Sequence, residues 1–215
     1  MHKAVIFDLD GTLADTLEDL ARAVNGALGR RGFPLHPLDA YRRMVGDGFR
    51  LLVTRALPED QRLPDRIEEL RAEASADYEE HCLVSTRPYE GVPELLAALH
   101  ARGIPLAILS NKPHELCLRV VAGLFPGAGF ALVRGEAPGF PRKPDPASAL
   151  DIARRLDLPP SEFAYLGDSD VDMSTAKAAG MTALGAGWGF RGAPELAAAG
   201  AAAILGSPME LLDFL

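Results

Sequence analysis

The stretch AVIFDLDGTLADT, residues 4–16, decides the fold that this sequence predicts. Its apolar run AVIF is typical of a short buried strand, and side chains in a strand alternate between two faces. If the extended backbone continues, Asp8 and Asp10 point the same way while Leu9 points into the core, and Gly11 allows a sharp turn. Taken alone, the two acids also suit a solvated turn.

The same design occurs again in FAYLGDSDVD, residues 163–172, where Asp168 and Asp172 follow an apolar run. The carboxyl ends of parallel strands share one edge of a sheet, so Asp8, Asp10, Asp168 and Asp172 are predicted to converge there. Crowded carboxylates repel one another unless a cation compensates them. Oxygen ligands of this kind favour Mg²⁺.

The run Asp168, Asp170 and Asp172 also resembles the opening of a calcium-binding EF-hand loop. That loop needs glycine where Met173 stands and a bidentate glutamate where Ala179 stands. The calcium-loop hypothesis is therefore rejected.

From residue 87 onward, apolar strands alternate with amphipathic helices, which predicts an α/β fold with a parallel sheet covered on both faces. Helix-like patterns fill residues 15–31 and 39–83, and no convincing strand lies between Asp15 and Arg87. We predict a catalytic core made of residues 1–15 and 87–215, with an all-helical insertion at residues 16–86. Strands are expected at residues 3–9, 104–110, 130–136, 162–168, 181–187 and 201–205.

The bulk properties exclude several classes of partner. The chain has 215 residues and a formal net charge of −8, which disfavours nucleic acids and anionic membranes. Two cysteines, Cys82 and Cys117, without a CxxC pair predict a reduced, cytoplasmic protein with no thiolate zinc site. No run of about 18 apolar residues exists, and the first residues do not fit a signal peptide.

Two further strand ends supply polar groups suited to a phosphate. Ser110 and Asn111 follow the apolar run at 104–109, where a hydroxyl and an amide can hold phosphate oxygens. Lys143, in RKPDP, precedes a helix opened by prolines. Lys112 competes with Lys143 for one role, and Lys143 is preferred because its KPDP setting fixes the backbone. A lone lysine there also suits a solvated surface.

With these motifs in order, the chain resembles the haloacid dehalogenase superfamily. The motifs are DLDGT at 8–12, Ser110-Asn111, Lys143 and GDSDVD at 167–172. The resemblance implies a Rossmann-like core, and the insertion after the first motif looks like its helical cap. The dehalogenase branch lacks the second acid of the first motif, so Asp10 implies a phosphatase or phosphomutase.

The resemblance also implies a mechanism. Asp8 would attack phosphorus and form an aspartyl-phosphate. Asp10 would protonate the leaving oxygen and then act as base on the hydrolytic water. Ser110 and Lys143 would stabilise charge on the phosphoryl group.

The cofactor implied is Mg²⁺. Its ligands would be the Asp8 carboxylate, the main-chain carbonyl of Asp10, and Asp168. Asp172 would orient waters or Lys143, and whether it binds the metal directly stays open.

Within the predicted cap, YRRMVGDGFRLL at residues 41–52 contains a loop at Gly46 and Gly48. This loop is similar to the substrate loop of the phosphoglycolate phosphatase subfamily, which implies that Gly46 and Arg50 bind substrate. Arg50 could meet a substrate carboxylate in bidentate geometry, and a structural salt bridge is an equal alternative. Asp15-Thr16 resembles the hinge of cap closure.

The leading hypothesis is a Mg²⁺-dependent phosphatase acting on a small phosphorylated metabolite, with 2-phosphoglycolate as the best single guess. A broad sugar-phosphate phosphatase, a pyrophosphatase and a β-phosphoglucomutase-like enzyme stay open as alternatives. The absence of lysine between Lys3 and Lys112 argues against the mutase and against phosphonoacetaldehyde hydrolase. The non-enzymatic alternative is a Mg²⁺- or phosphate-binding module. A monomer or a homodimer is expected.

Overall fold

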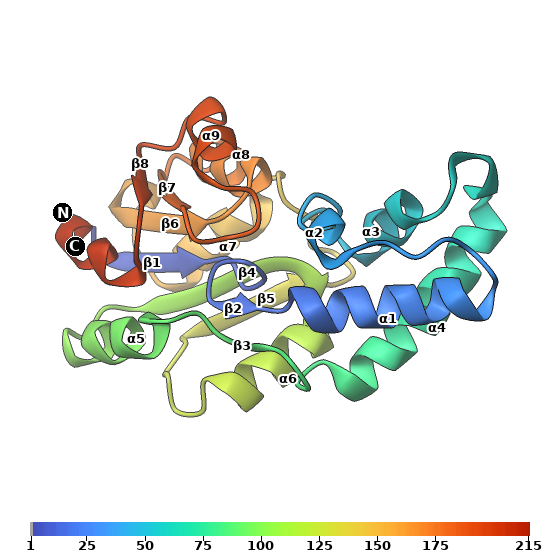
Figure 1. The fold of residues 1–215 in the computed structure, drawn as a ribbon. Helices are drawn as coiled ribbons and strands as arrows, with labels where there is room; N and C mark the ends of the chain where they lie inside the picture. The colour runs from blue at the N-terminus through green and yellow to red at the C-terminus, as the bar shows by residue number, and fades with distance from the viewer. Residues whose placement is uncertain (1) are drawn as a thin grey trace.

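The computed structural model describes residues 2–215 and is built around one parallel sheet. Within these residues the sheet has six strands in the order β5-β4-β1-β6-β7-β8, which confirms the α/β prediction (Figure 1). Neighbouring strands pair in parallel throughout. The strands are β1 (Ala4–Phe7), β4 (Leu106–Pro113), β5 (Leu132–Glu136), β6 (Phe163–Gly167), β7 (Thr182–Ala186) and β8 (Ala203–Leu205).

Helices cover both faces of this sheet, which explains why its central strands are apolar without interruption. Val5 and Phe7 pack on one face with residues of α5 and α6, and Ile6 packs on the other face with residues of α7, α8 and α9. Alternate side chains along β1 therefore belong to two separate apolar cores, one on each face of the sheet. These helices are α5 (Val92–Ala101), α6 (His114–Leu124), α7 (Ala147–Arg155), α8 (Asp170–Ala178) and α9 (Ala193–Ala198).

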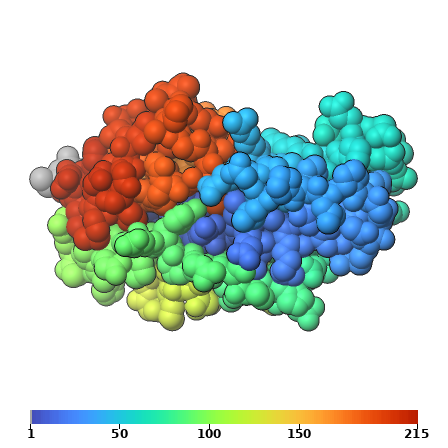
Figure 2. Space-filling view, viewed as in Figure 1, coloured from blue at the N-terminus to red at the C-terminus, as the bar shows by residue number. Residues whose placement is uncertain are grey.

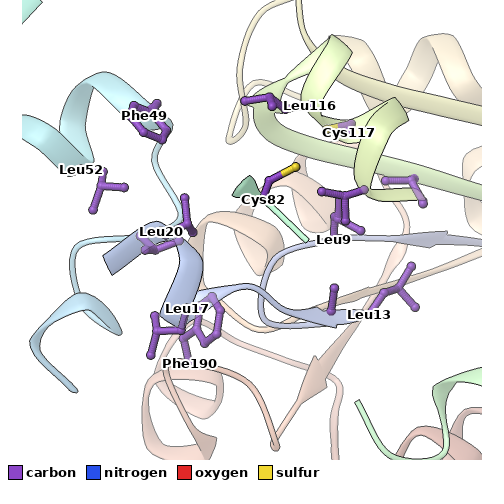
Figure 3. Packing of buried hydrophobic residues seen from close by; sticks show 14 of the residues in the cluster. Leu9, Leu13, Leu17, Leu20, Phe49, Leu52, Cys82, Leu116, Cys117 and Phe190 are labelled. Carbon is purple, nitrogen blue, oxygen red and sulfur yellow. The ribbon is translucent and has the colours of Figure 1, made fainter. Parts of the chain in front are cut away.

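The segment between residues 17 and 81 is helical, as predicted. Its helices gather beyond the end of the sheet where β1 stops, and Figure 2 shows this segment, in blue and cyan, at one end of the molecule. An apolar cluster joins it to the core, because Leu17 and Phe49 contact the same cluster as Leu116 of α6 (Figure 3). The helices are α1 (Leu17–Arg30), α2 (Leu38–Tyr41), α3 (Phe49–Ala56) and α4 (Pro64–His81), with a short 3₁₀ turn at Glu59–Gln61.

The chain leaves the sheet and returns to it at one place. β2 (Ala14–Asp15) pairs antiparallel with β3 (Arg87–Pro88), a two-residue ladder too short to predict from pattern. Beside it, the fully buried carboxylate of Asp19 accepts hydrogen bonds from the backbone N–H groups of Ser85 and Thr86. Nitrogen-to-oxygen distances of 2.9–3.1 Å make this a fixed crossing point.

Two predicted boundaries need correction. The strand expected at residues 104–110 continues to Pro113, so Ser110 and Asn111 lie inside β4 rather than after it. The pairing of β4 with β5 shifts register between Leu109 and Pro113, which is where the polar residues fall. The strand expected at residues 3–9 spans only Ala4–Phe7. In the part of the chain described, no helix is both long and apolar enough to cross a membrane.

Candidate active site

A cavity of about 40 Å³ lies between the end of the sheet and the helical segment. The predicted residues Asp8, Asp10 and Ser110 line it from the sheet side. The helical segment closes it with a largely apolar wall. The remaining lining residues are Leu20, Val45, Gly46, Gly48, Phe49, Leu52, Asn111, Lys112 and Pro113.

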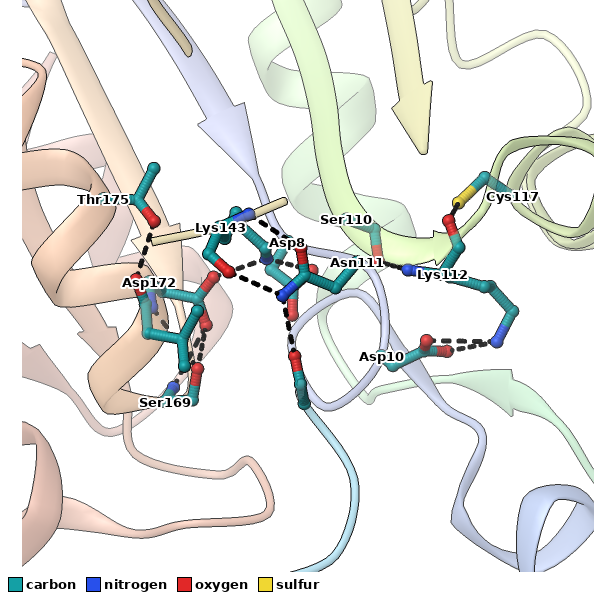
Figure 4. Close-up of polar contacts among 12 residues, drawn as sticks. Asp8, Asp10, Ser110, Asn111, Lys112, Cys117, Lys143, Ser169, Asp172 and Thr175 are labelled. Carbon is teal, nitrogen blue, oxygen red and sulfur yellow. Dashed lines mark hydrogen bonds and ion pairs between the residues drawn. The ribbon is translucent and has the colours of Figure 1, made fainter. Parts of the chain in front are cut away.

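Lys143 links two of the predicted acids. Its Nζ donates to Asp8 Oδ1 at 2.8 Å and to Asp172 Oδ1 at 2.6 Å, and its side chain is 3% exposed (Figure 4). Burial alone would lower the pKa of Lys143, but Asp172 and Asp8 reverse this and hold that pKa well above its ordinary value. Lys143 is therefore a charged group inside the site.

Three carboxylates crowd around this one ammonium group. Oxygens of Asp8, Asp168 and Asp172 lie within 4.8 Å of one another, and all three residues are buried. Burial, with Asp172 beside it, raises the pKa of Asp8 to about 7 against the opposing effect of Lys143. Burial, with Asp172 and Asp8, raises the pKa of Asp168 well above its usual range. Three carboxylates grouped around one ammonium group fit a divalent cation, which would favour their ionised forms, and hard oxygen donors suit Mg²⁺.

The three acids differ in how many donors already occupy them. Asp172 accepts from Lys143, from the Tyr165 hydroxyl at 3.4 Å, and from the Ser169 amide and hydroxyl at 3.2 and 2.6 Å. Ser169 and Asp172 form the capping box that starts α8, so this carboxylate is fixed by the helix terminus. Within residues 2–215, Asp8 accepts one side-chain hydrogen bond, and Asp168 accepts one, from the Phe190 amide at 2.7 Å. Asp8 and Asp168 therefore keep free oxygens for a cation.

The convergence of four acids was predicted, and the structure brings together only three. Asp10 turns away to Lys112, whose Nζ lies 2.8 and 3.0 Å from its two carboxylate oxygens. The reason is that β1 ends at Phe7 and the chain turns at Gly11, whose φ is +88°, so strand alternation does not extend to Asp10. Lys112 thus pairs with Asp10, and Lys143 pairs with Asp8 and Asp172, whereas the sequence set the two lysines in competition.

The loop after β7 also belongs to the site, which the sequence did not establish. Besides the bond from Phe190 to Asp168, Trp188 donates through Nε1 to the Thr12 carbonyl at 3.0 Å. A Cβ on Gly189 would lie 2.2 Å from the Asp168 Cβ, so the backbone passes Asp168 too closely for any side chain at this position. The signal in the sequence was GWGF directly after an apolar strand.

Three side chains of the core hold the loop at residues 45–47 by its main chain. Arg191 donates to the Val45 carbonyl at 2.9 Å, and Asn111 to the Gly46 carbonyl at 3.1 Å. Arg142 donates to the carbonyl of residue 47 at 3.4 Å. Arg142 directly precedes Lys143 and Arg191 directly follows GWGF, which is the signal that the sequence offered.

Asn111 and Arg50 were predicted to bind substrate. In the structure, both side chains bond other groups of the protein. The two N–H groups of Asn111 bond the carbonyls of Gly46 and Lys143, and its Oδ1 accepts from the Lys143 amide at 2.8 Å. Arg50 lies outside the cavity and pairs with Glu68 at 2.6 Å, which is the salt-bridge alternative. Helix α3 buries Phe49, Leu52, Val53 and Ala56, so the Arg50 side chain faces away from that stripe.

Comparisons with known proteins agree with this geometry. The model of a family described as haloacid dehalogenase-like hydrolase matches residues 2–180. A phosphoglycolate phosphatase of Rhodospirillum rubrum is 37% identical over 100% of this chain and 91% of its own length. An N-acetylmuramic acid 6-phosphate phosphatase of Pseudomonas aeruginosa is 33% identical, with coverage of 99% and 94%. A crystal structure of a Lactobacillus delbrueckii subsp. bulgaricus protein superposes with a TM-score of 0.93 at 31% identity, covering 100% of this chain and 98% of that one. The chain belongs to the haloacid dehalogenase-like hydrolases.

Proposed function

We propose that this protein is a Mg²⁺-dependent phosphatase that hydrolyses small phosphate monoesters through an aspartyl-phosphate on Asp8, with 2-phosphoglycolate as the leading substrate. The observation that carries the proposal is the buried Asp8 carboxylate, held by Lys143 at 2.8 Å and lining the cavity between the core and the helical segment. The phosphatase names of full-length relatives support the same reaction class.

In the proposed reaction, an oxygen of Asp8 bonds to phosphorus while the bond from phosphorus to the ester oxygen breaks. Asp10 gives a proton to the departing alkoxide and then takes one from the water that hydrolyses the aspartyl-phosphate. Lys143 and Ser110 stabilise charge on the phosphoryl oxygens. Mg²⁺ would bind Asp8, Asp168 and the main-chain carbonyl of Asp10, and would supply charge compensation. Both oxygens of Asp172 already accept hydrogen bonds, so its proposed role is to orient the Lys143 side chain.

The helical segment fits the proposed role of a cap, with residues 16–86 closing over the core at Asp15-Thr16. The cavity of about 40 Å³ between the core and this segment is small, so we expect small substrates to be favoured and a bulky sugar phosphate to need the segment to move. Among the described residues, no arginine lines the cavity, so we expect Asn111, Lys112 or main-chain N–H groups of the lining to meet a substrate carboxylate. A cytoplasmic location and a monomeric or homodimeric state stay predictions.

The test is phosphate release with Mg²⁺ from 2-phosphoglycolate, pyrophosphate, β-glucose 1-phosphate, N-acetylmuramic acid 6-phosphate and 2-phosphoethanol. The last compound matches 2-phosphoglycolate in size and lacks its carboxylate. We expect 2-phosphoglycolate to lead in kcat/KM by more than about tenfold, a difference of about 1.4 kcal/mol in transition-state binding. Equal rates on 2-phosphoethanol and 2-phosphoglycolate would show that the enzyme does not recognise the substrate carboxylate, and the phosphatase activity would still be supported. If none of these compounds released phosphate, the proposed phosphatase activity would be contradicted.

The crowded acids predict a large effect of the cation on stability. At a Mg²⁺ concentration about 100 times its Kd, binding adds about 2.7 kcal/mol to the free energy of unfolding. For a chain of this size that raises Tm by about 5 to 10 °C relative to EDTA. Asp168→Asn should abolish the shift, because it removes a ligand charge and keeps an acceptor for the Phe190 amide. A shift of the same size in wild type and variant would place the cation elsewhere. Differential scanning calorimetry measures both.

A further inference from the structure

Lys112 is a buried lysine to which the proposed mechanism gives no role. Its side chain is 3% exposed, and its ammonium group bonds both oxygens of Asp10 and the hydroxyl of Tyr78, each within 2.8–3.0 Å. Asp10 follows β1, Lys112 lies on β4, and Tyr78 lies on α4 of the helical segment. Three parts of the chain far apart in sequence thus meet at one nitrogen atom.

We propose that Lys112 is a positioning residue that fixes the Asp10 carboxylate, and that its bond to Tyr78 makes this fixation depend on the docking of α4. The proposal rests on the proposed function, in which Asp10 moves the proton. Within residues 2–215, Lys112 is the one side chain that bonds the Asp10 carboxylate. Without Lys112, that carboxylate would be free to rotate in the cavity that it lines.

Lys112 is itself held in place from several sides. Its amide donates to Ser110 Oγ at 3.3 Å, and its carbonyl accepts from Cys117 Sγ at 3.5 Å, as Figure 4 shows. Its ammonium lies 4.6 Å from the centroid of the Tyr78 ring. A long side chain is normally mobile, but here the main-chain bonds fix the base of the side chain while Asp10 and Tyr78 fix its ammonium group.

Tyr78 carries the link to the helical segment. It is fully buried, and its ring lies 6.0 Å from that of Phe49, which lines the cavity from α3. A movement of α4 away from the core would remove the hydroxyl from Lys112. Asp10 would then lose part of its support whenever the site opens to water, so proton transfer by Asp10 would be most efficient when α4 is docked on the core.

The test compares two leaving groups. A general acid contributes about 10²- to 10⁴-fold when the departing group is a poor one. With p-nitrophenyl phosphate the phenolate leaves without a proton. We expect Lys112→Met to lower kcat/KM by about a hundredfold on the best alkyl monoester and by less than about tenfold on p-nitrophenyl phosphate. Its KM for the alkyl ester should change by less than about threefold, because Lys112 acts on the proton rather than on binding.

Three further variants serve as comparisons and a control for Lys112→Met. Asp10→Asn should show the same split between the two esters. Tyr78→Phe keeps the ring and removes only the hydroxyl, so it should show a smaller split in the same direction, even if Lys112→Met fails to fold. Lys177→Met, on the outer end of α8, should match the wild type.

The outcomes separate the two proposals. If the wild type hydrolyses neither ester, the proposed function fails and the role of Lys112 fails with it. If the wild type is active and Asp10→Asn shows the split, equal losses on both esters in Lys112→Met and Tyr78→Phe would mean a merely structural role. No loss in either variant would overturn the positioning role as well, with the phosphatase left intact.

Discussion

Replacing Asp8 with asparagine is expected to lower phosphate release by at least about a thousandfold on every substrate, because the amide cannot form the aspartyl-phosphate. The change keeps the size of the side chain and an oxygen that accepts from Lys143. Single-turnover assays with Mg²⁺ and a phosphate ester measure the loss. Substantial turnover by Asp8→Asn would exclude Asp8 as the nucleophile.

The stability of the same variant provides the control. The pKa of Asp8 is raised to about 7, so the folded protein binds this proton more tightly than the unfolded chain, whose carboxyl titrates near 3.8. The ionised carboxyl therefore costs stability as pH rises from about 4 to 7, and asparagine avoids that cost. In EDTA at pH 8, Asp8→Asn should unfold at a temperature no lower than the wild type. A lower Tm would mean that lost activity partly reflects lost structure.

Replacing Lys143 with methionine is expected to damage both stability and turnover. Methionine leaves Asp8 and Asp172 buried without their shared cation, and breaking a buried pair costs about 3 to 5 kcal/mol. The raised pKa of Lys143 means that its contribution is complete below pH 10 and is lost only as pH rises through the folded value. Urea unfolding in EDTA at pH 7.5 measures the cost.

Lys3→Met is the matched control for that experiment. Lys3 also pairs with a carboxylate at 2.8 Å, that of Glu162, but its side chain is 63% exposed. An exposed pair contributes about 0 to 1 kcal/mol, so this variant should unfold like the wild type and keep full activity. Similar losses of unfolding free energy in the two lysine variants would show that the buried ion pairs contribute no more to stability than an exposed pair. A stable Lys143→Met with full turnover would remove Lys143 from the site.

The sequence predicted the features that are local in the chain. Strand and helix order follows from apolar periodicity, and Asp8 and Asp168 could be placed at one sheet edge because parallel strands share that edge. Asp172 was placed near them for the same reason, and its capping box is a local pattern of Ser169 and the third helical position. Backbone direction and a spacing of a few residues were sufficient for each.

Partner choice across long separations could not be predicted. Lys112 on β4 and Lys143 in the loop before α7 were both candidates for one role, and the turn at Gly11 directs Asp10 to the former. The sequence placed Arg50 in the site because it follows the loop at Gly46 and Gly48. Each step along a helix rotates the side chain by about 100°, and at position 50 of α3 this directs the side chain to Glu68. These choices depend on packing between segments, which a single sequence does not display.

The bonds from Arg191, Asn111 and Arg142 to consecutive carbonyls at residues 45–47 have an evolutionary consequence. Every amino acid carries a carbonyl, so mutations at Val45 and Asp47 can change what the loop presents to a ligand without losing its anchorage. Gly46 and Gly48 are the exceptions, since their φ angles of +121° and +89° favour glycine, and a Cβ on Gly48 would lie 2.8 Å from the Arg142 side chain. The loop can therefore change its other side chains around these two glycines, and new substrate preferences can arise while the catalytic groups beneath stay as they are.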